Sequence, residues 1–208
     1  MVLENIDLLR NNITVEGAAP LVQLFSERRH LESICGVEAD DTFAFHNNSN
    51  FSDADAVLMA AELKFNVSIT QLDLWRNDIT TEGAKALASA IRVNDSLTHL
   101  DLSSNEIDEV GATALFSSLH TNKNLTYLDL GDNEICGIDN DLWTNQSIVP
   151  GIVSLAKALK HNEWEKKTIL LGDKALECRE LEHLIDAVSG LAIVCEEESD
   201  DESDSAEG

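Results

Sequence analysis

Residues 69–79 read ITQLDLWRNDI, and this stretch decides the fold because it returns at a fixed spacing. It recurs 28 residues later at 97–107 as LTHLDLSSNEI, and again at 125–135 as LTYLDLGDNEI. An earlier copy, LENIDLLRNNI, occupies residues 3–13. Copies that keep the same leucine, asparagine and isoleucine positions at one spacing indicate a structural repeat.

The second half of each copy has the spacing of an amphipathic helix. Residues 83–91 read GAKALASAI, which puts four apolar side chains on one helical face: Ala84, Leu87, Ala88 and Ile91. Side chains able to cap a helix N-terminus stand at corresponding positions: Thr14, Ser52, Thr80 and Asp108. Glycines follow three residues later at Gly17, Gly83 and Gly111, where a side chain would push the helix off the strand. Each unit is therefore predicted to be a strand, an asparagine turn and a capped helix.

The pattern L-x-x-L-x-L-x-x-N-x-I-x-x-x-G-A resembles the ribonuclease-inhibitor-like class of leucine-rich repeats, which also occurs in Ran GTPase-activating proteins and in NOD-like receptors. The resemblance covers residues 3–164. It implies an α/β fold: a short right-handed solenoid arc of about five repeats, with a parallel sheet on the concave face and helices on the convex face.

Two units are longer than the period. The surplus residues fall near 39–50 and 136–150, at the same point of the repeat. Insertions at one point of a repeat project from one rim of a solenoid, so both segments are candidate binding loops. The alternative is that they are neutral surface insertions, since lengthening a loop costs little free energy.

The two ends of the array differ from its middle. Residues 165–195 are expected to form a degenerate terminal repeat, with a strand near 168–171 and a cap helix over 178–188. At the other end the first repeat has no preceding cap. Either this repeat shields itself, or it pairs with a second copy of the chain, or the chain is a fragment of a longer array.

Acidic residues dominate the composition, with 39 Asp and Glu against 14 Lys and Arg and a net charge of -25. Eight of the acids lie in the last thirteen residues, 196–208, which we expect to be a disordered tail in which Ser199 is a candidate phosphorylation site. This charge argues against direct binding of nucleic acid or an anionic membrane and favours a protein partner with a basic surface.

No secretory leader or membrane-spanning segment is indicated by the sequence, and its four cysteines are widely scattered. We therefore expect an intracellular protein, cytoplasmic or nuclear. Phosphate-binding, zinc-protease and calcium-loop motifs are also missing, so we predict no metal and no cofactor.

Side chains alternate along a strand, so residues flanking the buried leucines should line the concave sheet. With neighbouring strands about 4.8 Å apart, copies align in columns. One column reads Asn5, Ser33, Gln71, His99, Tyr127; the next reads Asp7, Cys35, Asp73, Asp101, Asp129; a third reads Leu9, Val37, Trp75, Ser103, Gly131. We predict partner contacts at Gln71, Asp73, Trp75, His99, Asp101, Tyr127 and Asp129, with Trp75 and Tyr127 as aromatic anchors. The aspartates have a structural alternative, which is hydrogen bonding within the repeat.

Three functions fit these features. The first is a non-enzymatic protein-interaction module that binds a partner through the concave sheet and one rim. The second is a GTPase-activating or regulatory role, because Ran GTPase activators combine this repeat class with an acidic tail. The third is an acidic histone-binding nuclear chaperone. His99 is accompanied by no nucleophile or oxyanion site, so we predict no catalytic residue and no enzymatic activity.

Overall fold

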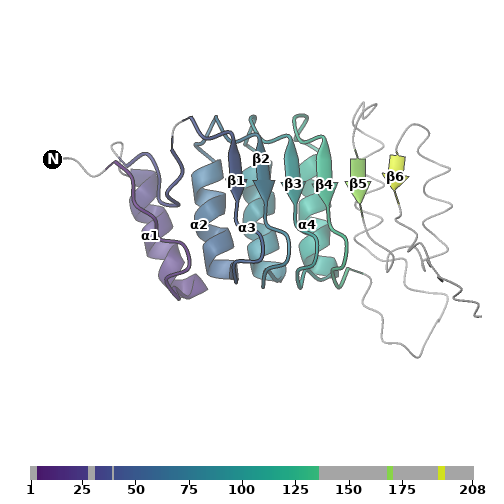
Figure 1. The fold of residues 1–208 in the computed structure, drawn as a ribbon, viewed down its shortest axis with the longest axis horizontal. Coiled ribbons are helices and arrows are strands. Elements are labelled where there is room, and N and C mark those ends of the chain that lie inside the picture. The colour runs from purple at the N-terminus through teal and green to yellow at the C-terminus, as the bar shows by residue number, and fades with distance from the viewer. Residues whose placement is uncertain (1–3, 28–30, 39, 136–167, 171–191, 195–208) are drawn as a thin grey trace, which may run out of the picture.

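The computed structural model describes residues 4–27, 31–38, 40–135, 168–170 and 192–194. Four helices, α1 (Val15–Glu27), α2 (Asp53–Leu63), α3 (Thr81–Ile91) and α4 (Glu109–Leu119), pack side by side in sequence order. The strands are β1 (Phe43–Phe45), β2 (Gln71–Asp73), β3 (His99–Asp101), β4 (Tyr127–Asp129), β5 (Thr168–Leu170) and β6 (Ala192–Val194). From α1 to β4, helices and strands alternate along the chain (Figure 1).

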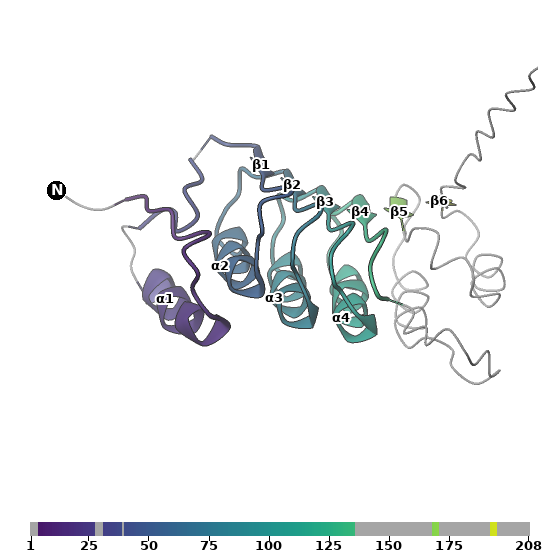
Figure 2. The same ribbon diagram turned by 60° about the horizontal axis from the view of Figure 1, so that its bottom comes forward.

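The strands form one parallel sheet in the order β1-β2-β3-β4-β5-β6, and the helices lie in a second layer against one of its faces (Figure 2). The register keeps the 28-residue period, since Gln71 aligns with His99 and His99 with Tyr127. The predicted α/β repeat solenoid is confirmed. We call the sheet surface turned away from the helices the open face.

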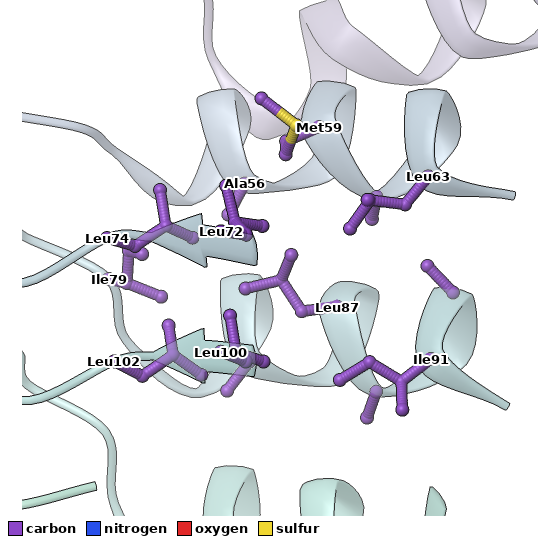
Figure 3. Packing of buried hydrophobic residues seen from close by; sticks show 14 of the residues in the cluster. Ala56, Met59, Leu63, Leu72, Leu74, Ile79, Leu87, Ile91, Leu100 and Leu102 are labelled. Atoms are coloured by element: carbon purple, nitrogen blue, oxygen red, sulfur yellow. The ribbon is translucent and has the colours of Figure 1, made fainter. Parts of the chain in front are cut away.

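The core lies between the two layers. Leu72 and Leu74 of one unit, and Leu100 and Leu102 of the next, point inward against Leu87 and Ile91 (Figure 3). Burying one such side chain stabilises the fold by about 1.5–3 kcal/mol. No unit can bury this surface alone, so each strand and helix is stabilised by its neighbours in the array.

The predicted helix caps hold at three of four positions. Thr14 accepts from Gly17, Asp108 accepts from Gly111, and Ser52 forms a reciprocal capping box with Asp55. The prediction is wrong at Thr80, whose side chain makes no cap bond. Asp53 of the preceding helix accepts from the Gly83 N–H in its place, at 2.9 Å.

The repeated asparagines join neighbouring units. The Asn105 side chain donates to the carbonyls of Leu74 and Leu102 and accepts from the Ile79 N–H, and Asn77 and Asn133 repeat this arrangement in their own units. Asn94 and Asn122 do the same after the helices, each donating to a carbonyl 31 residues earlier. These amides satisfy buried backbone groups of the turns.

Residues 39–50 were expected to form a projecting loop, and the structure differs. Phe43–Phe45 is strand β1, which aligns with Gln71–Asp73 at the regular spacing. Ala44 stands where the later units have Leu72, Leu100 and Leu128, and it is itself buried. This unit is therefore in phase with those that follow, and the surplus residues lie before it.

The first unit joins the array differently from the others. Asn5 and Asp7 form isolated bridges with Ser33 and Cys35, and no ladder links Ser33–Cys35 to β1. The predicted neighbours Asn5–Ser33 and Asp7–Cys35 are confirmed by these bridges. The columns are wrong at the next step, because Phe43 and Phe45 lie beside Gln71 and Asp73 where Ser33 and Cys35 were expected. Val37, placed in the third column, is buried.

The Ser33–Cys35 segment is held by a buried carboxylate. Glu62 on α2 accepts from the Ser33 hydroxyl at 3.2 Å and the Ile34 N–H at 2.9 Å. Burial raises the pKa of Glu62, and the hydrogen bonds from Ile34 and Ser33 oppose this effect. Glu62 thus supplies the hydrogen bonds that a neighbouring strand supplies elsewhere.

At the C-terminal end, β5 confirms the strand expected near 168–171. Several predictions fall outside the described residues: the insertion at 136–150, the cap helix over 178–188, and the tail at 196–208 with Ser199. Within the described ranges, no helix is long and apolar enough to cross a membrane.

Candidate functional site

The open face carries two columns of outward side chains on β1 to β5. The central residue of each of these strands is buried and its two neighbours are wholly or partly exposed. The pairing register places Phe43, Gln71, His99, Tyr127 and Thr168 in one column and Phe45, Asp73, Asp101, Asp129 and Leu170 in the other. The structure therefore brings together six of the seven predicted contact residues, and Trp75 follows β2 directly.

The three aspartates hold the turns that follow their strands. Asp73 accepts from the Trp75 N–H at 3.0 Å, Asp101 from the Ser103 N–H at 2.9 Å, and Asp129 from the Gly131 N–H at 2.9 Å. The residue after each of these donors has a positive φ: Arg76, Ser104 and Asp132. This short-range bond stabilises a turn that needs a left-handed residue. One oxygen of each aspartate thus holds its turn, and the second oxygens of Asp73 and Asp129 accept from the Asn47 side chain and the Tyr127 hydroxyl.

The aspartates also give the open face a negative charge. All three are only partly buried. Among the residues that the structure describes, the one ion pair within 4.0 Å is Lys85 with Glu82 on α3, away from the face. Within the described residues the Asp73 and Asp101 carboxylates form no ion pair, while each also holds its turn.

Two aromatic rings on the face are fixed by their neighbours. His99 and Tyr127 stack with ring centroids 5.6 Å apart and an interplanar angle of 23°. The Tyr127 hydroxyl donates to Asp129 at 3.2 Å, and His99 Nδ1 lies 2.8 Å from the Thr98 hydroxyl. Rings held in this way lose little conformational entropy on contact with a partner.

Trp75 stands at the edge of this group. Its side chain is 39% exposed, and the Arg76 guanidinium lies over the ring at 5.9 Å. Arg76 is the basic side chain next to the aromatic group, and its stacking on Trp75 keeps the guanidinium beside the indole. The face therefore offers an apolar ring, a cation and several carboxylates within adjoining units.

Sequence reasoning missed two exposed rings of the face, Phe43 and Phe45. Phe43 and Phe45 are 48% and 63% exposed and stack in parallel with centroids 5.8 Å apart. The signal was the 28-residue spacing from Phe43 to Gln71, which was obscured because Ala44 and His46 replace the two leucines of the motif. His46 is partly buried, and this burial, together with Arg10, lowers its pKa.

No group of three His, Cys, Asp or Glu side chains within the described ranges could hold a metal ion. The His99 ring has a hydroxyl and a tyrosine as neighbours. This arrangement suits recognition of another protein surface, since large rings flanked by polar groups are frequent contact residues at interfaces.

Comparison with known proteins gives a consistent result for the fold. The family described as Leucine Rich repeat matches residues 65–88, 93–116 and 121–135. The chain thus contains leucine-rich repeats, as predicted, while the ribonuclease-inhibitor-like subtype stays a prediction. No curated protein matches the sequence significantly.

Among 66 matching chains of solved structure is one titled "Leiomodin-1 Actin-Binding Site 2 (ABS2)". It is 26% identical, with a TM-score of 0.55, and the alignment covers 70% of this chain and 79% of that one. A second is the tropomodulin C-terminal domain of Caenorhabditis elegans, 14% identical with a TM-score of 0.42, covering 86% of this chain and 90% of that one.

Proposed function

We propose that this protein is a non-enzymatic interaction module that binds a protein partner through the open face and the adjoining turns that follow the strands. The observation that carries the proposal is the group of outward rings, Phe43, Phe45, Trp75, His99 and Tyr127, standing beside the column of aspartates. Large rings on a sheet surface gain free energy when a partner removes them from water.

The charge on this face indicates what kind of partner it fits. Asp73, Asp101 and Asp129 occupy successive strands, and the whole chain carries a net charge of -25. A partner surface with lysines or arginines would associate faster and in a defined orientation. Phosphate backbones and anionic lipid surfaces would be repelled by the same charge.

The similarity to leiomodin-1 actin-binding site 2 supports a binding role and makes actin the first defined partner to test. The GTPase-regulatory and histone-chaperone alternatives gain no support from the comparisons, and we do not propose them. The actin test is co-sedimentation of the full chain with actin filaments, together with the rate of actin polymerisation. Absence of both effects would leave the open face as a binding surface for another protein.

The central experiment is affinity capture followed by mass spectrometry. It compares the full chain with the double variant Trp75→Ala plus Tyr127→Ala, which removes two rings from the face. A matched control, Val93→Ala plus Val110→Ala, removes exposed apolar side chains outside the two columns. We expect the face variant to lose specific proteins that the control retains. If both variants capture the same proteins as the unmodified chain, the open face is not the binding surface.

A further inference from the structure

One edge of strand β1 has no partner strand among the residues that the structure describes. There, β1 is the first strand of the sheet and pairs with β2 alone (Figure 1). In a parallel ladder the N–H and C=O of one residue point to one side, and those of the next residue point to the other. The His46 N–H donates to Asp73, and the Thr42 carbonyl accepts from Gln71. Even-numbered residues therefore face β2, and Phe43 and Phe45 face the edge.

The repeat itself shows what is missing at this edge. The N–H groups of Gln71, His99 and Tyr127 each donate to a threonine carbonyl of the preceding unit, at 3.0 to 3.2 Å. Phe43 holds the same position in its unit, yet within the described residues nothing accepts from it. The preceding segment, Ser33–Cys35, is bonded to Asn5–Asp7 and to Glu62.

The side chains at this edge are apolar and exposed. Exposed edge strands are usually protected by charged side chains or by a covering segment, because they invite pairing with another chain. β1 instead presents the parallel phenylalanine stack. Backbone donors and acceptors beside an exposed apolar pair are the features by which a sheet edge accepts an extended peptide as an added strand.

The carboxylates before and beside β1 favour a basic segment as the added strand. Residues 31–45 contain Glu32, Glu38, Asp40 and Asp41 and no lysine or arginine. Asp73 lies opposite Phe45 on the next strand. A second copy of this chain would bring the same carboxylates against themselves, whereas a basic segment would neutralise them.

We propose that the free edge of β1 binds an extended segment of a partner protein in which apolar and basic side chains alternate. The apolar side chains would cover Phe43 and Phe45, and the Phe43 and Phe45 backbone groups would pair with the incoming strand. This site goes beyond the open-face proposal because it uses main-chain groups at one end of the sheet. The two proposals can fail independently.

The test uses the full chain and a labelled probe peptide, acetyl-KVKVKVK-amide, with acetyl-EVEVEVE-amide as the charge control. Phe45→Ala and Phe45→Pro both remove the ring, but only proline also removes the outward N–H. Proline is tolerated here because that N–H makes no bond to β2. Fluorescence anisotropy should show Phe45→Pro binding the basic peptide about five- to tenfold more weakly than Phe45→Ala, as expected for one lost backbone hydrogen bond. The acidic peptide should not bind.

Amide hydrogen exchange gives a second readout that is independent of affinity. The Phe43 and Phe45 amides should exchange more slowly when the basic peptide is bound. Equal affinities for Phe45→Ala and Phe45→Pro, or unchanged exchange at both amides, would overturn edge pairing. A homodimer that is lost in Phe45→Pro would also overturn the proposal, since the edge would then be occupied by a second copy. Peptide binding that is lost in Trp75→Ala plus Tyr127→Ala, but equal in the two Phe45 variants, would support the open face alone.

Discussion

Asp53, the first residue of helix α2, accepts hydrogen bonds from both the backbone N–H and the hydroxyl of Thr80, at 2.8 and 2.6 Å. Its first oxygen also accepts from the Gly83 N–H. The start of α3 is therefore capped by the preceding unit and not by its own threonine. Helix capping here is part of the contact between repeats, so a substitution in one unit should destabilise the next.

We predict that Asp53→Ala lowers the free energy of unfolding by about 2 kcal/mol, because the first turn of α3 loses its acceptor. The control is Asp78→Ala, an exposed carboxylate in the same turn that should change stability by less than about 0.5 kcal/mol. Urea unfolding followed by circular dichroism measures both. Equal effects of the two variants would show that Asp53 is not the cap.

The same contact explains why position 83 carries glycine. A Cβ there would lie 2.6 Å from an Asp53 oxygen and 2.8 Å from the Ile79 side chain. Gly83→Ala should destabilise the protein by about 1–3 kcal/mol. Because both substitutions disturb one contact, Gly83→Ala plus Asp53→Ala should cost less than the two single losses together. Additive losses in the double-mutant cycle would contradict this account.

Asn105 offers a test of how much the repeated asparagines stabilise the contact between neighbouring units. Its buried amide bonds to three carbonyls and one N–H. Asn105→Ala leaves the buried Ile79 N–H without its acceptor and removes one of the two donors to each carbonyl, since Asn77, Asn133 and the Arg76 N–H keep the others. We expect a loss of about 2 kcal/mol. Asn124→Ala, at a partly exposed position with one long side-chain contact to Asp95, is the matched control and should cost under about 1 kcal/mol. Thermal or urea unfolding distinguishes the two.

Glu62 predicts a specific dependence of stability on pH. Burial raises its pKa above 4.5, so the folded protein holds this proton more tightly than the unfolded chain. The stability that Glu62 contributes is complete below the unfolded pKa and decreases as pH rises through the folded pKa. Glu62→Gln should remove that decrease. The difference in the free energy of unfolding between this variant and the unmodified chain should therefore change between pH 4 and pH 7. Glu106→Gln, an exposed carboxylate, controls for overall charge; an identical profile for both variants would be inconsistent with our assignment.

The reactivity of the Cys35 thiol tests whether the Ser33–Cys35 segment is held in place by Glu62. Burial, followed by the nearby Glu62 carboxylate, raises the pKa of its thiol well above the usual value, which slows reaction with thiol reagents. In a chain whose other cysteines are replaced by serine, Cys35 should react at least about tenfold more slowly than after denaturation. Glu62→Ala should speed the reaction, because the Ser33–Cys35 segment loses its acceptor. Rapid labelling of the native protein would show that the segment is open.

Much of the fold could be predicted from the residues at 69–79 and their copies. The leucines of the motif determined β2, β3 and β4, their register and their buried positions, because inward and outward side chains must alternate on a strand packed against helices. The outward positions of Gln71, His99 and Tyr127 followed from the same alternation. Whether these residues contact a partner stays a prediction.

The errors came from positions where another residue type replaces a motif residue. Ala44 is buried as Leu72 is, yet it does not mark a strand in the sequence. Glu62 stands on a helix face that is otherwise apolar, and nothing in the sequence shows that it holds Ser33–Cys35. Both features depend on segments that come together only when neighbouring units pack.

The sequence alone determined the 28-residue period, and with it the parallel sheet, the core and the asparagine turns. These features depend on which residues are buried, and the repeated leucine, asparagine and isoleucine positions identify those residues. Only the tertiary structure decided how the first unit joins the array. Two segments, Ser33–Cys35 and Phe43–Phe45, could each have taken the strand position before β2. The segment that forms the ladder with Gln71–Asp73 is the one that lies 28 residues before it, and the other is held by Glu62. Within the described part of the chain, that outcome leaves no strand beside the outward N–H and C=O groups of Phe43 and Phe45, and this is the free edge of the sheet.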